Sequence, residues 1–140
     1  MLKFDARQNH ILHLSWLAFF FSFVAWFNMA PFNTTLIRTV GLSHEQINIL
    51  MLCNVSLTIP ARILIGIMVD HFGPRKVFSY LLIFSAGVCF YFASGKTFEE
   101  LLIARLLMGI VGAGFVVGIK MISEWFPPKK MGLAQGIYAG

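Results

Sequence analysis

The 140-residue sequence is apolar and basic: 58% of its residues are hydrophobic, 12% are charged, and the formal net charge is +5 at pH 7. Soluble domains carry about 25% charged residues, so this composition excludes an ordinary soluble domain and indicates a membrane protein. The basic residues are spread over several loops instead of forming one patch, which argues against nucleic-acid binding.

The first apolar segment covers about residues 14–31. A helix needs about 17–25 residues to cross a bilayer core of roughly 30 Å, so this segment is long enough to span it. It follows two basic residues, as a secretory signal does, but its apolar run is too long and no small-x-small cleavage pattern follows it. We therefore expect a retained helix. Phe27 and Asn28 near its end are weak candidates for contacting a substrate, since such residues are more often interface anchors.

The second apolar segment, about residues 49–69, contains Arg62 among neutral residues. A charged side chain inside a membrane helix costs at least ~2.5–3.5 kcal/mol, so it usually faces a cavity or the bundle interior. Arg62 precedes Asp70 by eight residues, or about 12 Å at ~1.5 Å per residue, which places the guanidinium near mid-membrane. No acidic residue lies at that depth on the predicted helices. Arg62 is therefore predicted to bind an anionic substrate or a group outside this chain, although an internal partner or snorkelling to the headgroups is the structural alternative.

Local signals predict where the helices begin and end. Ser43 and Gln46 have the spacing of a capping box before the second helix. Gly73-Pro74 predicts a turn before a third helix over about residues 77–93. A fourth helix is expected over about residues 101–122, ended by Pro127-Pro128, and a fifth begins near Met131.

The fourth segment contains two charged residues and a series of glycines. Arg105, near one end, could reach water or Glu99 by snorkelling or could face a cavity, and the sequence does not decide between these. Lys120 and Glu124 are one turn apart and suit an ion pair along the helix. The glycines predict close helix packing, with sliding surfaces or backbone approach to a substrate as the alternative; they are Gly109, Gly112, Gly114 and Gly118, followed by Gly132, Gly136 and Gly140 in the fifth segment.

The distribution of charge predicts the orientation. Three loops on one side are basic, at Lys3 and Arg7, at Arg75 and Lys76, and at Lys129 and Lys130. By the positive-inside rule these loops are cytoplasmic, so the N-terminus is expected in the cytoplasm. The membrane is expected to be the plasma or inner membrane of the cell. The predicted fold class is an all-α, polytopic helical bundle in contact with the lipid bilayer.

No chemistry beyond binding is indicated. The sequence offers no paired nucleophile and base, no metal-ligand cluster and no phosphate-binding loop, so we expect neither an enzyme nor a cofactor. Cys53 and Cys89 stand singly in apolar segments without CxxC spacing and are interpreted as small packing residues.

Several motifs resemble those of the major facilitator superfamily. The loop between the second and third segments is similar to its Gly-x-x-x-Asp-Arg-x-Gly-x-Arg-Arg motif, with His71 in place of the usual arginine; it reads Gly66-Ile67-Met68-Val69-Asp70-His71-Phe72-Gly73-Pro74-Arg75-Lys76. Arg105 followed by Gly109, Gly112 and Gly114 resembles the superfamily's fourth helix. Three further stretches resemble the nitrate/nitrite porter family: Trp26-Phe27-x-x-Ala30-Pro31, Arg62-Ile63-Leu64-x-Gly66, and Trp125-Phe126-Pro127-Pro128-Lys129-Lys130 leading into Gly132-Leu133-Ala134-x-Gly136.

The resemblance implies a function for two sets of residues. In that family the arginine corresponding to Arg62 binds the substrate anion together with a second arginine from the C-terminal half, and the glycine-rich nitrate signature of the fifth helix begins only at about Gly136 to Gly140. The loop motif implies a cytoplasmic gate whose charge pairs change during transport, with Gly66, Asp70, Gly73, Arg75 and Lys76 as the gating residues. The resemblance thus implies that residues 1–140 are part of the N-terminal six-helix domain of a secondary transporter.

The resulting hypothesis is alternating-access transport of nitrate or nitrite, with a coupling proton or a counter-transported anion as a further partner. Two alternatives remain open. The first is a transporter of the same superfamily for another small solute, such as an organic anion or a sugar. The second is an inactive truncated fragment, because four helices and part of a fifth cannot supply both halves of an alternating-access cavity.

Overall fold

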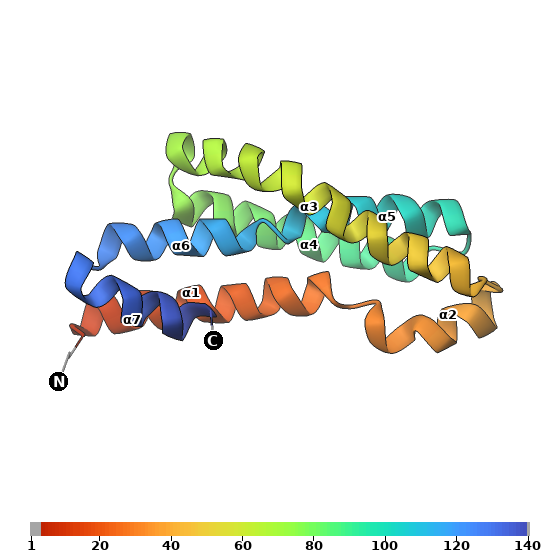
Figure 1. Cartoon of the computed structure of the whole chain (residues 1–140), viewed down its shortest axis with the longest axis horizontal. Coiled ribbons are helices and arrows are strands. Elements are labelled where there is room, and N and C mark those ends of the chain that lie inside the picture. The colour runs from red at the N-terminus through yellow and green to blue at the C-terminus, as the bar shows by residue number, and fades with distance from the viewer. Residues whose placement is uncertain (1–3, 140) are drawn as a thin grey trace.

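The computed structural model describes residues 4–139, and these residues are helical almost throughout (Figure 1). No strand occurs in this described range. The elements in chain order are α1 (Ala6–Trp26), the short 3-10 helix η1 (Ala30–Phe32), α2 (Asn33–Val40), α3 (His44–Phe72), α4 (Pro74–Ser94), α5 (Phe98–Val111), α6 (Gly114–Trp125) and α7 (Pro128–Ala139).

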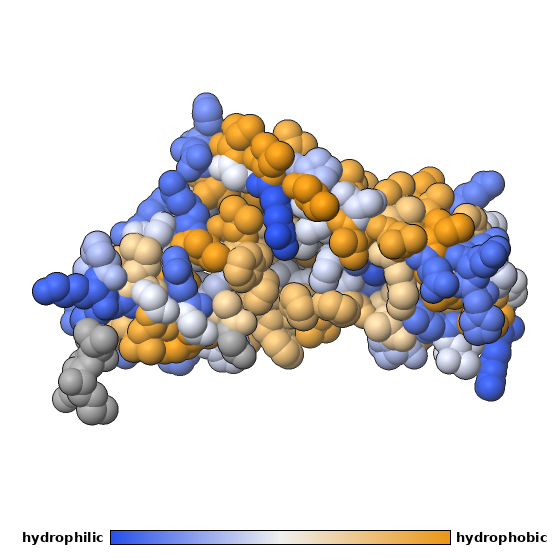
Figure 2. Space-filling view, in the orientation of Figure 1, coloured by the Kyte–Doolittle hydropathy of each residue, from blue (hydrophilic) through white to orange (hydrophobic). Residues whose placement is uncertain are grey.

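Four stretches are long and apolar enough to cross a membrane. They cover Ala6–Val40, His44–Phe72, Pro74–Ser94 and Phe98–Trp125. In the space-filling view, hydrophilic residues gather at the two ends of the elongated molecule and apolar residues dominate the middle (Figure 2). The predicted class, an all-α membrane protein with four spans, is confirmed.

Two of the expected helices are broken. The first span is divided into α1, η1 and α2, because Pro31 lacks a backbone N–H and the chain forms a 3-10 turn around it. The fourth span is divided into α5 and α6 at Gly112 and Ala113, where glycine disfavours a continuous helix. Neither break was predicted from the sequence. The last helix begins at Pro128 and not near Met131, since proline suits the first helical position.

The predicted signals at the two ends of α3 are confirmed. The Ser43 hydroxyl accepts the Gln46 backbone N–H at 3.2 Å, and the Gln46 side chain accepts the Ser43 N–H at 2.9 Å. At the other end Gly73 has φ +82°, a conformation that residues with a Cβ rarely adopt. Pro74 then begins α4 directly. α3 and α4 are therefore antiparallel neighbours (Figure 1).

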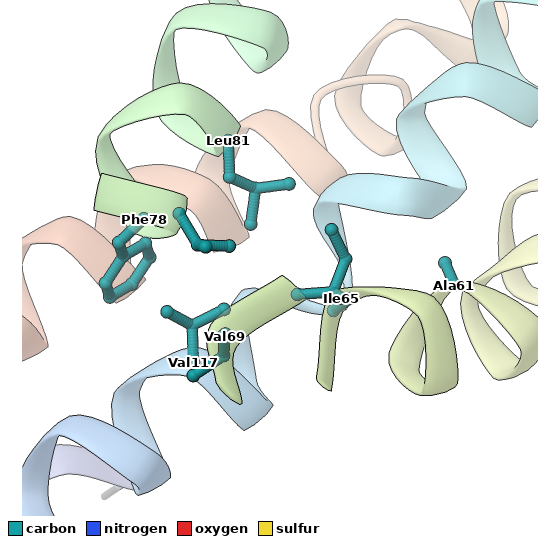
Figure 3. Close-up of a cluster of buried hydrophobic side chains, with 8 residues drawn as sticks. Ala61, Ile65, Val69, Phe78, Leu81 and Val117 are labelled. Atoms are coloured by element: carbon teal, nitrogen blue, oxygen red, sulfur yellow. The ribbon is translucent and has the colours of Figure 1, made fainter. Parts of the chain in front are cut away.

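One face of α3 packs into a buried apolar cluster (Figure 3). Ala61, Ile65 and Val69 are spaced by four residues and therefore share that face. They meet Val77, Phe78 and Leu81 of α4 together with Ala113 and Val117 near the α5–α6 break. Because each residue turns the helix by about 100°, Arg62 is directed away from the cluster while its neighbour Ala61 is inside it.

The glycines of the fourth span lie where helices approach most closely. A Cβ on Gly109 would lie 2.6 Å from the backbone oxygen of Asn54, and one on Gly112 would lie 2.8 Å from Thr58 Cγ2. At Gly114 the Ser22 hydroxyl would be 3.2 Å away, and at Gly118 the added atom would overlap the Tyr138 ring.

The expected glycine contacts of the fifth segment are different. A Cβ on Gly132 or Gly136 would meet nothing within 4 Å. These two positions therefore do not use their small size for packing among the described residues, and Gly140 lies outside those residues.

A methyl group at Gly109 should destabilise the bundle. Gly109→Ala places the new carbon against the main-chain oxygen of Asn54, which cannot move aside as a side chain could. We expect a loss of about 1–3 kcal/mol in the free energy of unfolding, as for other overpacked sites. Thermal unfolding in detergent measures this loss of stability.

Gly87→Ala on α4 is the matched control. A Cβ at Gly87 would meet nothing within 4 Å, so this variant should be as stable as the parent or up to about 1 kcal/mol more stable. Equal stability of the two variants would contradict the packing role of Gly109.

Candidate functional site

The main candidate site is a cavity of about 670 Å³ between α1, α3, the α5–α6 break and α7. Its walls are mostly aromatic and aliphatic, and Arg62 is the one charged residue among them. The walls are formed by Trp16, Phe19, Phe20, Ser22, Phe23, Trp26, Arg62, Val111, Gly112, Phe115, Ile137, Tyr138 and Ala139.

Arg62 has no hydrogen bond or ion pair to any residue in the described range 4–139. The ion pair formed within that range joins Lys120 to Asp70 instead. The Arg62 side chain is exposed on α3, next to the buried Ala61 that anchors the helix. Its planar guanidinium therefore offers five N–H donors to whatever enters the cavity. Neutral, apolar walls weaken the screening of this charge, so an anion is favoured over a cation or a neutral solute.

Ring contacts connect the aromatic wall of the cavity. The centroids of Phe19 and Tyr138 are 5.0 Å apart, those of Phe19 and Phe115 are 5.7 Å apart, and those of Phe23 and Trp26 are 5.8 Å apart. Each distance lies in the range of favourable aromatic pairs. The rings come from α1, α6 and α7, so the wall is assembled from segments near the two ends of residues 4–139.

Three of the weaker sequence candidates, Phe27, Asn28 and Gly136, do not line this cavity. Phe27 is 48% exposed and packs on Phe23 with a centroid distance of 4.7 Å. Asn28 is turned toward α5, where its Oδ1 accepts a hydrogen bond from Arg105 at 3.0 Å. Gly136 is exposed, away from the cavity wall, and Gly140 lies outside the described residues.

Arg105 differs from both of its expected environments. Its side chain is 4% exposed, so neither snorkelling to water nor a contact with Glu99 occurs, and it is absent from the cavity wall. Its Nη1 donates to Asn28 Oδ1 at 3.0 Å, its Nη2 donates to the Trp26 carbonyl at 3.3 Å, and its charge lies 5.8 Å from the centroid of Phe92. The Trp26 carbonyl and the Asn28 side chain are available to Arg105 because α1 ends at Trp26. This helix end was not predicted from the sequence.

The predicted gating residues do not form one cluster. Asp70 Oδ1 lies 2.9 Å from Lys120 Nζ, which joins the end of α3 to α6. The expected pair between Lys120 and Glu124 was wrong, because Lys120 turns toward Asp70. Arg75 and Lys76, in the first turn of α4, line a second cavity of about 720 Å³ between α1, α4 and α6.

The two glycines of the predicted gate have different surroundings. A Cβ on Gly66 would meet nothing within 4 Å. Gly73 provides the left-handed turn between α3 and α4. Across residues 4–139, no group of three His, Cys, Asp or Glu side chains is placed to hold a metal ion.

Comparison with known proteins gives a consistent family. A model described as "Major Facilitator Superfamily" matches residues 15–140. The nitrate/nitrite transporter NrtP of Picosynechococcus sp. is 54% identical over 140 residues, which is 100% of this chain and 26% of that protein. The NrtP of Nostoc punctiforme is 57% identical over 140 residues, or 100% of this chain and 28% of that protein.

A more distant relative is the probable nitrate/nitrite antiporter NarK1 of Thermus thermophilus, 37% identical over 131 residues, which are 91% of this chain and 29% of that protein. The chain thus spans between a quarter and a third of the length of these curated relatives. No solved structure matches it. Because the superfamily model covers nearly all of the sequence, as the loop and glycine motifs predicted, this multi-pass membrane chain belongs to the Major Facilitator Superfamily.

Proposed function

We propose that this chain forms part of a secondary transporter that moves nitrate or nitrite by alternating access, with Arg62 as a ligand of the anion. The observation that carries the proposal is the unpaired guanidinium of Arg62 on the wall of an otherwise neutral, aromatic cavity. The similarity of the whole chain to proteins named as nitrate/nitrite transporters supports this choice of anion.

Geometry favours arginine over lysine for this solute. Nitrate is planar with three equivalent oxygens, and a guanidinium presents a planar fork of N–H donors that can contact two of them. An ammonium group offers only a compact point charge. The largely apolar walls lower the local dielectric, which strengthens the attraction between the ion and Arg62. The anion is bound and released chemically unchanged, so the proposed activity is transport and not catalysis.

The chain is proposed to be one part of a larger transporter. By the positive-inside rule, the N-terminus is cytoplasmic and the protein lies in a plasma or inner membrane. The chain would supply part of an N-terminal six-helix domain, with a second anion ligand from the other half of the transporter. A coupling proton or a counter-transported anion would complete the cycle. The gate would use Asp70 and the basic start of α4.

Arg62→Lys tests the fork geometry. The chain, inserted in place of the matching segment of the Nostoc punctiforme relative, should support uptake of 15N-labelled nitrate in cells that lack their own nitrate transporters. Arg62→Lys keeps the charge but removes the fork, so uptake at low nitrate should fall roughly tenfold or more, equivalent to about 1.4 kcal/mol of binding. Arg62→Gln, which removes the charge, should abolish it.

Arg38→Lys is the matched control, because Arg38 is exposed on α2 and does not line the cavity. Its uptake should equal that of the parent chimera. Near-parental nitrate uptake by Arg62→Lys would discard the fork and favour another solute, such as an organic anion or a sugar. If the parent chimera is inserted in the membrane but takes up no nitrate, the chain does not support this transport.

The ion pair between Asp70 and Lys120 provides a test of the gate. Both side chains are well exposed, 66% and 43%, so the pair contributes only about 0–1 kcal/mol to stability. Asp70→Asn should nevertheless lower nitrate uptake several-fold if the pair helps to hold one state of the transporter. The charge-swapped variant Asp70→Lys with Lys120→Asp should recover part of the uptake. Glu124→Gln, one turn away on α6, is the control and should change little. Full uptake by Asp70→Asn would contradict the role in gating.

A further inference from the structure

Arg105 is a buried cation that the proposed anion site does not use. It is 4% exposed and donates hydrogen bonds to Asn28 Oδ1 at 3.0 Å and to the Trp26 carbonyl at 3.3 Å. No carboxylate in residues 4–139 pairs with it. A guanidinium surrounded by neutral acceptors is costly to bury, so its position calls for an explanation other than stability alone.

Both acceptors of Arg105 lie where α1 ends. The last carbonyls of a helix have no partner within the helix, so the Trp26 carbonyl is free to accept from elsewhere. Two side chains use it: Arg105 from α5, at 3.3 Å, and Asn54 Nδ2 from α3, also at 3.3 Å. Asn54 is itself buried, at 4% exposure. Three helices are thus tied together at one main-chain oxygen.

The same residue, Trp26, places its side chain on the wall of the Arg62 cavity. Its indole Nε1 is buried and has no hydrogen-bond partner among the described residues. A Cβ added to Gly112, which also lines the cavity, would come within 3.0 Å of this nitrogen. A bulkier residue at that position would displace the indole. The main chain of Trp26 is therefore held by Arg105 on one side, and its ring is seated against Gly112 at the cavity wall.

We propose that Arg105 is a positioning residue for the anion cavity: by holding the Trp26 carbonyl and the Asn28 amide, it sets the position of the Trp26 ring on the cavity wall that also contains Arg62. This inference rests on the proposed function. The Trp26 ring is part of the cavity wall, whereas its Nε1 is buried beside Gly112, so the proposed role concerns the position of the ring and not a hydrogen bond from the indole to the anion.

Lysine cannot replace Arg105 in this role. Arg105 reaches its two acceptors with two different nitrogens, Nη1 and Nη2, whereas lysine has a single ammonium nitrogen. Arg105→Lys keeps the buried charge but loses the planar fork, because one ammonium nitrogen, even with three N–H donors, cannot occupy the positions of both Nη1 and Nη2. The end of α1 would then shift, and small displacements at a binding wall can have large effects on binding.

The experiment uses the nitrate-transporting chimera and measures KM and Vmax for 15N-labelled nitrate. We expect Arg105→Lys to raise KM roughly fivefold to tenfold with Vmax within twofold of the parent. Asn28→Ala removes one acceptor without touching a charge, and it should raise KM in the same direction. The double variant should raise KM by less than the product of the two single effects, because both act on one contact. Arg38→Lys is the control and should leave KM unchanged.

KM is the decisive quantity because it does not depend on how much transporter is folded. A KM within twofold of the parent in both Arg105→Lys and Asn28→Ala overturns the proposal, even if Vmax or the melting temperature falls, since those changes indicate a purely structural role. If Arg105→Lys does not reach the membrane, Asn28→Ala alone decides. The proposed function fails separately: it fails if Arg62→Lys and Arg62→Gln transport normally, whereas this inference fails while Arg62 is still required.

Discussion

The close approach of α3 and α5 at Gly109 is the contact on which the rest of the arrangement depends. Without a side chain at this position, the backbone of α5 lies almost against the Asn54 carbonyl. The Thr58 hydroxyl then lies 2.8 Å from the Gly109 oxygen, and the Asn54 amide reaches the end of α1. In a bilayer, where burying apolar surface between helices gains little, such short contacts and interhelical hydrogen bonds are what hold helices together.

Helix breaks give this bundle its polar interior. A continuous helix satisfies its own backbone groups and presents only side chains to its neighbours. Where α1 ends at Trp26, a main-chain carbonyl becomes available at a depth that is otherwise apolar, and Arg105 and Asn54 occupy it. The second break, at Gly112 and Ala113, provides the flat surface that receives the Trp26 ring. Trp26, at the first break, lies next to Gly112, at the second break, and both residues line the cavity.

The two arginines within the spans are held in opposite ways. Arg105 donates hydrogen bonds to the oxygens of Asn28 and Trp26 and lies near the ring of Phe92, although its Nε is buried without a partner among the described residues. Arg62 has no such partners in the described part of the chain and faces the cavity. A charge without a partner contributes little to the stability of the fold. It can contribute to binding, because its full interaction energy remains available to a solute. This difference separates a ligand of the anion from a residue that shapes its site.

The features that were correctly predicted depend on nearby residues only. Four apolar spans follow from composition over about 20 residues, and the capping box at Ser43 and the turn at Gly73 follow from the backbone needs of a few positions. The role of Arg62, which was singled out because its neighbours are neutral, stays a prediction. Other features needed the folded chain. Arg105 and Trp26 are 79 positions apart, and Lys120 pairs with Asp70 of α3 instead of with Glu124, which is one turn away on the same helix. A side chain takes the partner that packing brings within reach, and in a bundle that partner usually comes from another helix, so sequence spacing along one helix could not identify it.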